Sequence, residues 1–227
     1  MKKFLILLAL TISSSSLFAQ CDKIFDFREG TSWTWYNYDK KGKLIGKTIQ
    51  KVDKYEVNGD SRKASLSIVN ADKKGDQTAP VSMEMTCKAG VIYADMKKFI
   101  PKEYMEEDNG ETSLEISGNN LELPASMKVG DALRDASVAV NISGSSTMAM
   151  NFTVQITNRK VESEETLNSP AGQFQCLVIS QKVSTKMMVS VEVETKDWYS
   201  PGIGAVKSES YRKGKMMGYS ILSAFNK

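Results

Sequence analysis

Methionine is unusually frequent in this sequence, with 12 copies in 227 residues. Met83 with Met85, and Met148 with Met150, are spaced two residues apart, so each pair projects from one side of a strand. Phe152 continues the side of the second pair. Thioethers are soft ligands for Cu(I), and they are also flexible apolar groups that fill cores or line cavities for greasy ligands. Because spacing alone shows no converging set of sulfurs, we expect these five side chains to face the interior as core or cavity lining, without a metal.

The sequence offers little for catalysis. It contains no histidine, which removes Ser-His and Cys-His nucleophile pairs and His-ligated zinc. Ser210 and Lys213 have a Ser-x-x-Lys spacing, but that motif acts at a helix start, and here it enters a Lys-Gly turn. The acidic stretch at 106–111 matches no calcium-loop spacing. We therefore predict no enzyme activity, no cofactor and no metal site.

Three cysteines allow one disulfide in an oxidising compartment. Cys176 lies inside an apolar run, where a free thiol packs as a small hydrophobe. Cys21 lies near the mature N-terminus and Cys87 ends a strand-like segment. We expect a bridge between Cys21 and Cys87, although spacing alone leaves the other pairings open.

Residues 1–19 have the pattern of an export signal. Lys2 and Lys3 precede an apolar run, and Ala19 provides the small residue before cleavage. The run is too short for a stable transmembrane anchor, and no other segment of the chain predicts one. Acylation of Cys21 is the alternative, but Gln20 is not the small residue that a lipoprotein signal needs. We expect a mature chain of residues 20–227, exported and not lipidated.

The expected mature chain is nearly neutral, so it is neither a strongly basic nor a strongly acidic protein. Without Lys2 and Lys3, 28 of the 30 basic residues remain against 27 acidic ones. The overall charge therefore gives no indication of binding to nucleic acid.

Apolar and polar residues alternate along most of the mature chain, which predicts half-buried strands. The closing stretch 197–225 reads as two hairpin strands, and its Lys-Gly turn at 212–215 resembles the turn at 40–43. These like-built hairpins indicate an antiparallel meander whose two ends meet. We predict an all-β fold, a single domain at 20–227. It contains about a dozen strands in one large curled antiparallel sheet, barrel-like or a sandwich, with at most one short helix.

Several segments carry more detailed predictions. Pro101 interrupts the helical candidate at 95–107. The segment 119–124 reads as a loop, and the lysine-rich strand at 44–57 is typical of a protected sheet edge. Residues 148–156 and 161–167 read as two separate strands.

Four turn-like motifs together resemble a family of exported bacterial β-proteins known as a domain of unknown function, some of whose members are labelled TapB-like. The likeness covers most of the mature chain and implies a barrel-like fold in the periplasm or at the outer membrane of a Gram-negative cell. It brings no catalytic residues, because the family has no settled activity. The motifs are Gly30-Thr31-Ser32-Trp33-Thr34-Trp35, Thr86-Cys87-Lys88-Ala89-Gly90-Val91-Ile92-Tyr93, Ser169-Pro170-Ala171-Gly172-Gln173-Phe174-Gln175-Cys176 and Trp198-Tyr199-Ser200-Pro201-Gly202-Ile203-Gly204-Ala205-Val206-Lys207.

Two functions follow as expectations. The first is an exported, envelope-associated binding or accessory protein that holds a lipid or other apolar ligand, or docks an envelope protein. The second is a structural or interaction protein of the cell surface that acts through its sheet edge and hairpins, with no ligand. A deep apolar cavity favours the first, and a filled interior with an exposed apolar patch favours the second.

Overall fold

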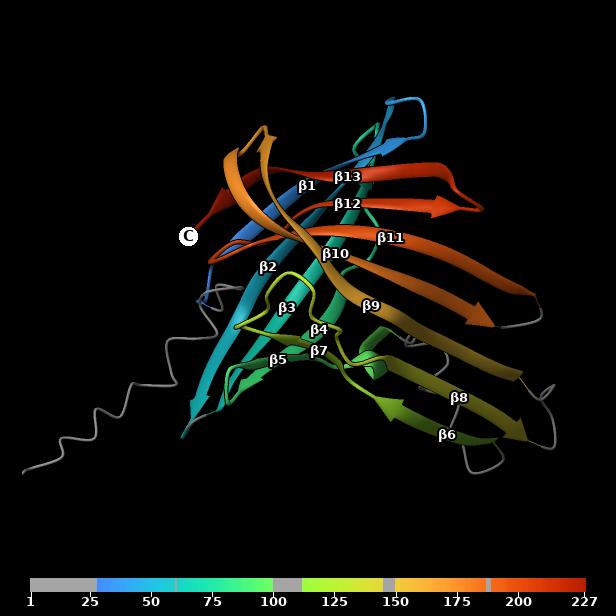
Figure 1. Ribbon diagram of the computed structural model, residues 1–227. Helices are drawn as coiled ribbons and strands as arrows, with labels where there is room; N and C mark the ends of the chain where they lie inside the picture. The colour runs from blue at the N-terminus through green and yellow to red at the C-terminus, as the bar shows by residue number, and fades with distance from the viewer. Residues whose placement is uncertain (1–27, 60, 100–111, 145–149, 187–188) are drawn as a thin grey trace, which may run out of the picture.

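The computed structural model describes residues 28–59, 61–99, 112–144, 150–186 and 189–227. They form one 13-stranded antiparallel sheet that curls into a barrel-like shape (Figure 1). This confirms the predicted all-β class. The elements are β1 (Ser32–Asp39), β2 (Leu44–Asn58), β3 (Ser61–Asp72), β4 (Val81–Lys88), β5 (Val91–Ala94), the 3-10 helix η3 (Met96–Phe99), β6 (Thr112–Asn119), β7 (Leu121–Pro124), β8 (Ala136–Gly144), β9 (Met150–Ser169), β10 (Gly172–Lys186), β11 (Ser190–Ser200), β12 (Gly204–Arg212) and β13 (Lys215–Asn226).

The first and last strands lie side by side in the middle of the sheet. The strand order is β6-β8-β9-β10-β11-β12-β13-β1-β2-β3-β4-β5-β7. The β1–β13 register runs from Ser32 opposite Asn226 to Asp39 opposite Gly218. The two hairpins at opposite ends of the sequence therefore meet, as the repeated Lys-Gly turns predicted.

The loop that follows β7 brings the two sides of the curled sheet together. It runs along β9, where Gly130 donates to the Val161 carbonyl over 2.8 Å and Val161 donates to the Asp131 carbonyl over 2.9 Å. Leu133 donates to the Arg159 carbonyl over 2.8 Å. These bonds pair backbone groups of β9 that would otherwise be left unpaired, which is costly when they are buried. They make a seam between the loop and β9 that nearly closes the barrel.

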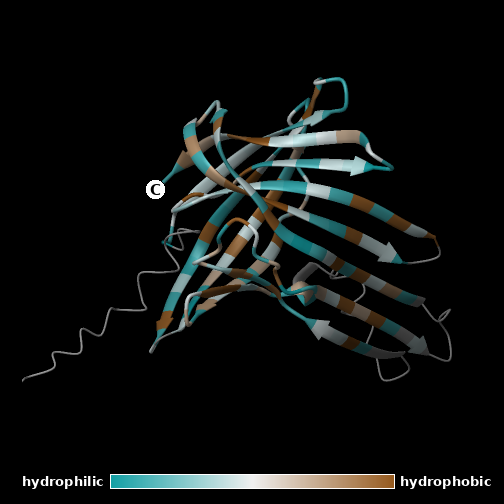
Figure 2. Cartoon of the chain, viewed as in Figure 1, coloured by the Kyte–Doolittle hydropathy of each residue, from teal (hydrophilic) through white to brown (hydrophobic). Residues whose placement is uncertain are grey.

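The main core lies on the inner face of the sheet. Figure 2 shows polar and apolar residues alternating along the strands. Trp33 is fully buried there, and its Nε1 donates to the Ile203 carbonyl over 2.7 Å. The sequence alternates because successive side chains on a strand point to opposite faces. The other large, fully buried apolar residues of this core are Val52, Leu66, Ile92, Val161, Ile179, Val206 and Leu222.

A second, smaller apolar cluster lies where η3 covers β8. Its buried members are Met96, Val138 and Val140, and Phe152 and Ile156 of β9 pack against them while staying partly exposed. The curled sheet therefore packs two separate apolar clusters.

The structure corrects the prediction of two strands between 148 and 167. β9 is one strand, Met150–Ser169. Asn158 has φ of +54°, and the register with β10 shifts between Ser180 and Lys182. Asparagine tolerates the left-handed conformation better than most residues do, so the chain bends at a bulge without leaving the sheet.

Two further local predictions were wrong. The expected loop at 119–124 contains β7, a short strand that pairs with β5 at the edge of the sheet. The expected edge strand at 44–57 is β2, which lies between β1 and β3. Its lysines reflect a solvated outer face, and the strand has a partner on both sides. The described part of the helical candidate at 95–107 is η3.

Substituting valine at the glycine of either Lys-Gly turn should destabilise the fold by about 1–2 kcal/mol. Gly42 has φ of +75° and Gly214 has φ of +71°, and an added Cβ would meet no atom within 4 Å at either position. The cost therefore comes from backbone strain alone. Urea unfolding of Gly42→Val and Gly214→Val measures it, with Lys43→Ala as a near-neutral control. Unchanged unfolding midpoints for both valine variants would refute the requirement for positive φ.

Candidate functional site

The structure separates the residues predicted to line one apolar cavity. Met83 and Met85 pack in the main core, whereas Phe152 packs against the second cluster. Met148 lies outside the described residues, and Met150 is described only as the first residue of β9. The described members of the set therefore do not surround a common space.

The structure describes two of the three cysteines. Cys176 is a free, buried thiol, and its burial raises its pKa to about 11. Cys87 is buried in the main core. Cys21 lies outside the described residues, so the Cys21–Cys87 bridge stays a prediction.

We expect selective reduction of that bridge to lower the free energy of unfolding by about 3–4 kcal/mol, because the bridge restricts the unfolded chain. Peptide mapping under non-reducing conditions identifies the connectivity. A linked peptide that contains Cys176 would contradict the assignment.

A buried polar cluster, which sequence reasoning missed, lies at the seam. Arg159 is buried, and its Nη1 donates to the carbonyls of Glu122 (3.0 Å) and Arg134 (2.6 Å). Its Nε donates to Gln181 Oε1 over 3.1 Å, and Gln181 Nε2 donates to Asp197 Oδ2 over 2.9 Å. Arg159 thus joins β7, the loop before β8, and β10 from within.

Burial controls the ionisation of this cluster. It raises the pKa of Asp197, although hydrogen bonds from Ser208, Thr195 and Gln181 act in the opposite direction. Burial also lowers the pKa of the Arg159 guanidinium. The cluster is enclosed by packed residues and bonded internally, which suits a structural connection better than ligand capture. No pattern in the sequence distinguishes Arg159 from a solvated arginine.

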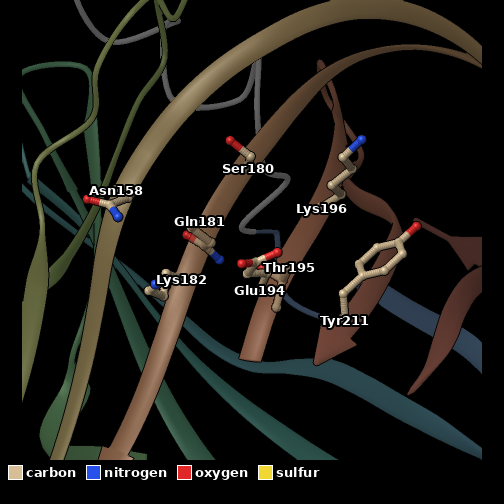
Figure 3. A pocket seen from close by; sticks show the side chains of 8 residues that line it. All are labelled: Asn158, Ser180, Gln181, Lys182, Glu194, Thr195, Lys196 and Tyr211. Carbon is tan, nitrogen blue, oxygen red and sulfur yellow. The ribbon is translucent and has the colours of Figure 1, made fainter. Parts of the chain in front are cut away.

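A shallow polar groove of about 390 Å³ crosses β10, β11 and β12 (Figure 3). Ser180 lies opposite Lys196, and Glu194 lies opposite both Lys182 and Tyr211, so these five side chains share one face. Figure 3 shows Ser180, Lys196 and Tyr211 projecting to the same side. Asn158, Gln181 and Thr195 also border the groove.

The polar groups of this groove are largely engaged with protein neighbours. Lys182 pairs with Glu192 over 3.0 Å, and the Ser180 hydroxyl donates to Glu162 over 2.8 Å. Tyr211 donates to Glu209 over 2.5 Å, a hydrogen bond that raises the pKa of Tyr211 to about 12. Few polar groups of the groove are therefore left to hydrogen-bond a polar molecule.

The Ser-x-x-Lys pair does not meet in the structure. The Ser210 hydroxyl donates to the Gly218 carbonyl across the hairpin over 3.3 Å. Lys213 is exposed at the turn. The acidic stretch at 106–111 lies outside the described residues. Within the described ranges, no three His, Cys, Asp or Glu side chains gather as metal ligands.

Three basic turns lie at one end of the barrel. They follow β1, β3 and β12, which belong to the contiguous strands β12-β13-β1-β2-β3. Asp39 lies opposite Gly218 and Gly46 opposite Asp72, so the bases of neighbouring turns adjoin. The turns carry eight exposed cations: Lys40, Lys41, Lys43, Lys73, Lys74, Arg212, Lys213 and Lys215.

Two of these turns have the same internal structure. Asp39 Oδ1 accepts hydrogen bonds from the backbone N–H of Lys41 (2.8 Å) and Lys43 (3.0 Å), which lower the pKa of Asp39. Asp72 Oδ1 accepts in the same way from Lys74 (2.8 Å) and Asp76 (3.0 Å). The repeated Asp-Lys-Lys-Gly sequence therefore fixes both loops through the aspartate and leaves the lysine side chains outside.

Exposed apolar side chains stand directly behind the basic turns. Ile45 is the extra residue of a bulge between β1 and β2, and Met217 is the extra residue of a bulge between β12 and β13. Their exposed fractions are 52% and 49%, and that of Leu44 is 40%. Bulges redirect side chains and recur at functional edges. We call the eight cations together with Leu44, Ile45 and Met217 the basic rim.

Comparison with known proteins identifies a family for the chain. A family model described as DUF3108-like matches residues 28–222. No curated protein matches the chain. The TapB-like label suggested by the sequence motifs is not confirmed by these comparisons.

Two solved structures share the fold. A candidate exported protein of YmcC-like fold from Bacteroides fragilis is 23% identical, with a TM-score of 0.70 over 91% of this chain and 100% of that chain. A candidate lipoprotein from Parabacteroides distasonis is 22% identical, with a TM-score of 0.70 over 91% of this chain and 99% of that chain. No helix in the described part of the chain is long and apolar enough to span a membrane.

Proposed function

The chain belongs to the DUF3108-like family, and on that premise we propose that it is an exported, envelope-associated accessory protein that docks through its basic rim. Export is supported by the signal-like residues 1–19 and by the descriptions of two proteins that share the fold, one a candidate exported protein and the other a candidate lipoprotein. The role is one of interaction, without catalysis.

The distribution of apolar residues carries this proposal. Apolar residues of the main core line the inner face of the barrel, and Met83 and Met85 pack among them as ordinary core residues. Nine large apolar side chains in the described part of the chain are exposed, and six of them lie at the end that bears the basic rim. An exposed apolar group gathered at one end is typical of a contact surface. The six are Leu44, Ile45, Val81, Val189, Val191 and Met217.

One observation favours the alternative of a small apolar ligand. Val183 lies opposite both Ile156 and Val193, and all three are only partly buried. This strip on β9, β10 and β11 could hold a thin acyl chain along the sheet. Native mass spectrometry of the protein purified from cell envelopes separates the two functions. A ligand-binding protein should carry a stoichiometric apolar molecule, and a docking protein should have the mass of the bare chain.

Cell fractionation tests docking directly. The full chain should sediment with envelope membranes and be released by high salt, because screened charges lose their attraction. A variant with Lys40, Lys41, Lys73 and Lys74 replaced by glutamine should appear in the soluble periplasmic fraction. Equal distribution of the two proteins would overturn the docking role.

A further inference from the structure

We propose that the partner of the basic rim is the anionic phospholipid surface of an envelope membrane, bound through headgroup phosphates with shallow insertion of apolar side chains. This inference rests on the proposed docking function and names its partner. The basic rim combines two features that a lipid surface uses together, a dense group of cations and exposed aliphatic side chains between them.

The charge of the three turns differs from that of the chain as a whole. Their eight cations face three carboxylates, Asp39, Asp72 and Asp76, whereas the whole chain has a formal net charge of +3. Asp39 and Asp72 each accept two backbone hydrogen bonds within their own loops. The lysine side chains, in contrast, point out from loops that are held by backbone bonds. The turns therefore present a positive surface of fixed shape to phosphate groups.

The apolar part is placed by the backbone. An ordinary strand residue at position 45 or 217 would be paired within the sheet, but the two bulges leave Ile45 and Met217 unpaired and exposed. Water-facing aliphatic groups among lysines are unfavourable in solution and favourable at the boundary between headgroups and acyl chains. Both bulges lie within three residues of a basic turn, so the cations and apolar groups reach one surface together.

Aromatic residues continue the same surface toward the body of the barrel. Tyr38 and Tyr219 stack with ring centroids 4.8 Å apart, one residue before Asp39 and one after Gly218. Tyrosine is favoured at membrane interfaces because its ring is apolar and its hydroxyl is hydrated. A nucleic acid would use the cations but gains nothing from Leu44, Ile45 and Met217, so the lipid surface fits the whole rim better.

Vesicle flotation with the purified full chain tests the inference. Vesicles of phosphatidylglycerol and phosphatidylethanolamine should carry the protein upward, and vesicles of phosphatidylcholine alone should not. High salt should release the bound protein, because the attraction acts between exposed charges. Binding to both kinds of vesicle alike would overturn the inference.

Two charge variants make the test specific. The first variant replaces Lys40, Lys41, Lys73 and Lys74 by glutamine. It should weaken vesicle binding roughly 600-fold, since each of the four cations near an anionic bilayer contributes about fivefold. The control changes Lys51, Lys54, Lys88 and Lys128, which are exposed away from the rim, and should bind like the parent. The loop-fixing bonds of the rim join aspartate side chains to backbone N–H groups and use no lysine side chain, so both variants should unfold at the parent midpoint. An equal loss in both would indicate attraction by net charge alone and would overturn the rim.

The apolar contribution is tested separately. Ile45→Ser with Met217→Ser should reduce binding about tenfold or more while leaving its salt dependence intact, because only the inserted groups are lost. If this double variant binds the vesicles as tightly as the parent, the proposed insertion of apolar side chains is wrong. If the parent sediments with cell envelopes through its rim but ignores phosphatidylglycerol vesicles, the partner is a protein: the lipid inference then fails while the docking function stands.

Discussion

Replacing Arg159 by methionine is expected to lower the free energy of unfolding by about 3–5 kcal/mol, the cost of removing one partner from a buried charged cluster. Methionine conserves much of the volume but leaves the carbonyls of Glu122 and Arg134 without the guanidinium that joins them. Asp197 also loses its neighbouring positive charge, and unpaired buried polar groups are costly. The seam should therefore weaken before the rest of the sheet.

Urea unfolding and hydrogen exchange measure this effect together. The control is Lys160→Met on the next residue, an exposed lysine whose pair with Glu162 lies at the surface, and its cost should be below about 1 kcal/mol. Exchange of the Gly130 and Leu133 amides should accelerate most in the Arg159 variant, since they bond across the seam. Equal costs for the two variants would show that Arg159 does not hold the barrel together.

Trp33→Ala is expected to cost about 3–5 kcal/mol, as large aromatic truncations in cores do. Trp33 is fully buried, lies with its ring centroid 5.6 Å from that of Phe225, and donates to the Ile203 carbonyl. One side chain thus connects β1, β13 and the turn before β12. Its removal leaves a cavity and an unbonded carbonyl where the ends of the chain meet.

A residue on the same strand supplies the matched control. Tyr36 has 37% of its surface exposed, so Tyr36→Ala should cost about 1 kcal/mol or less. Calorimetric or urea-induced unfolding of both variants decides the matter. A larger loss for Tyr36 than for Trp33 would contradict the assignment of the core to the inner face.

Local patterns in the sequence predicted local structure well. Alternating residues predicted the strands, and the Lys-Gly motifs predicted turns whose glycines have positive φ, as Gly42 and Gly214 do. The similarity of the two hairpins also predicted that β1 and β13 meet. These successes rest on interactions between residues near in sequence, or on a repeated motif.

Features that depend on distant pairing were not predictable in the same way. The alternation Leu121-Glu122-Leu123 in β7 is too short to predict a strand between two asparagines and a proline, and its strand conformation comes from pairing with β5. The lysines of β2 predicted an edge strand because a solvated outer face and a protected edge carry the same lysine-rich pattern. The Arg159 cluster needs the seam, which no local pattern specifies.

The basic rim could have been predicted in part from a repeated sequence motif. Asp72-Lys73-Lys74-Gly75 repeats Asp39-Lys40-Lys41-Gly42 and forms the same loop. The balanced charge of residues 20–227 concealed this local excess of cations, because carboxylates elsewhere compensate it. Only the strand order brings the third turn, at 212–215, to the same end of the barrel.

Photo-crosslinking in intact cells tests most directly whether the protein docks through the basic rim. A photoreactive residue at position 45 should crosslink to an envelope component. The same group at position 57, where Val57 is 58% exposed at the other end of β2, should leave the chain uncrosslinked. Equal crosslinking from both positions, or crosslinking from position 57 alone, would contradict the account.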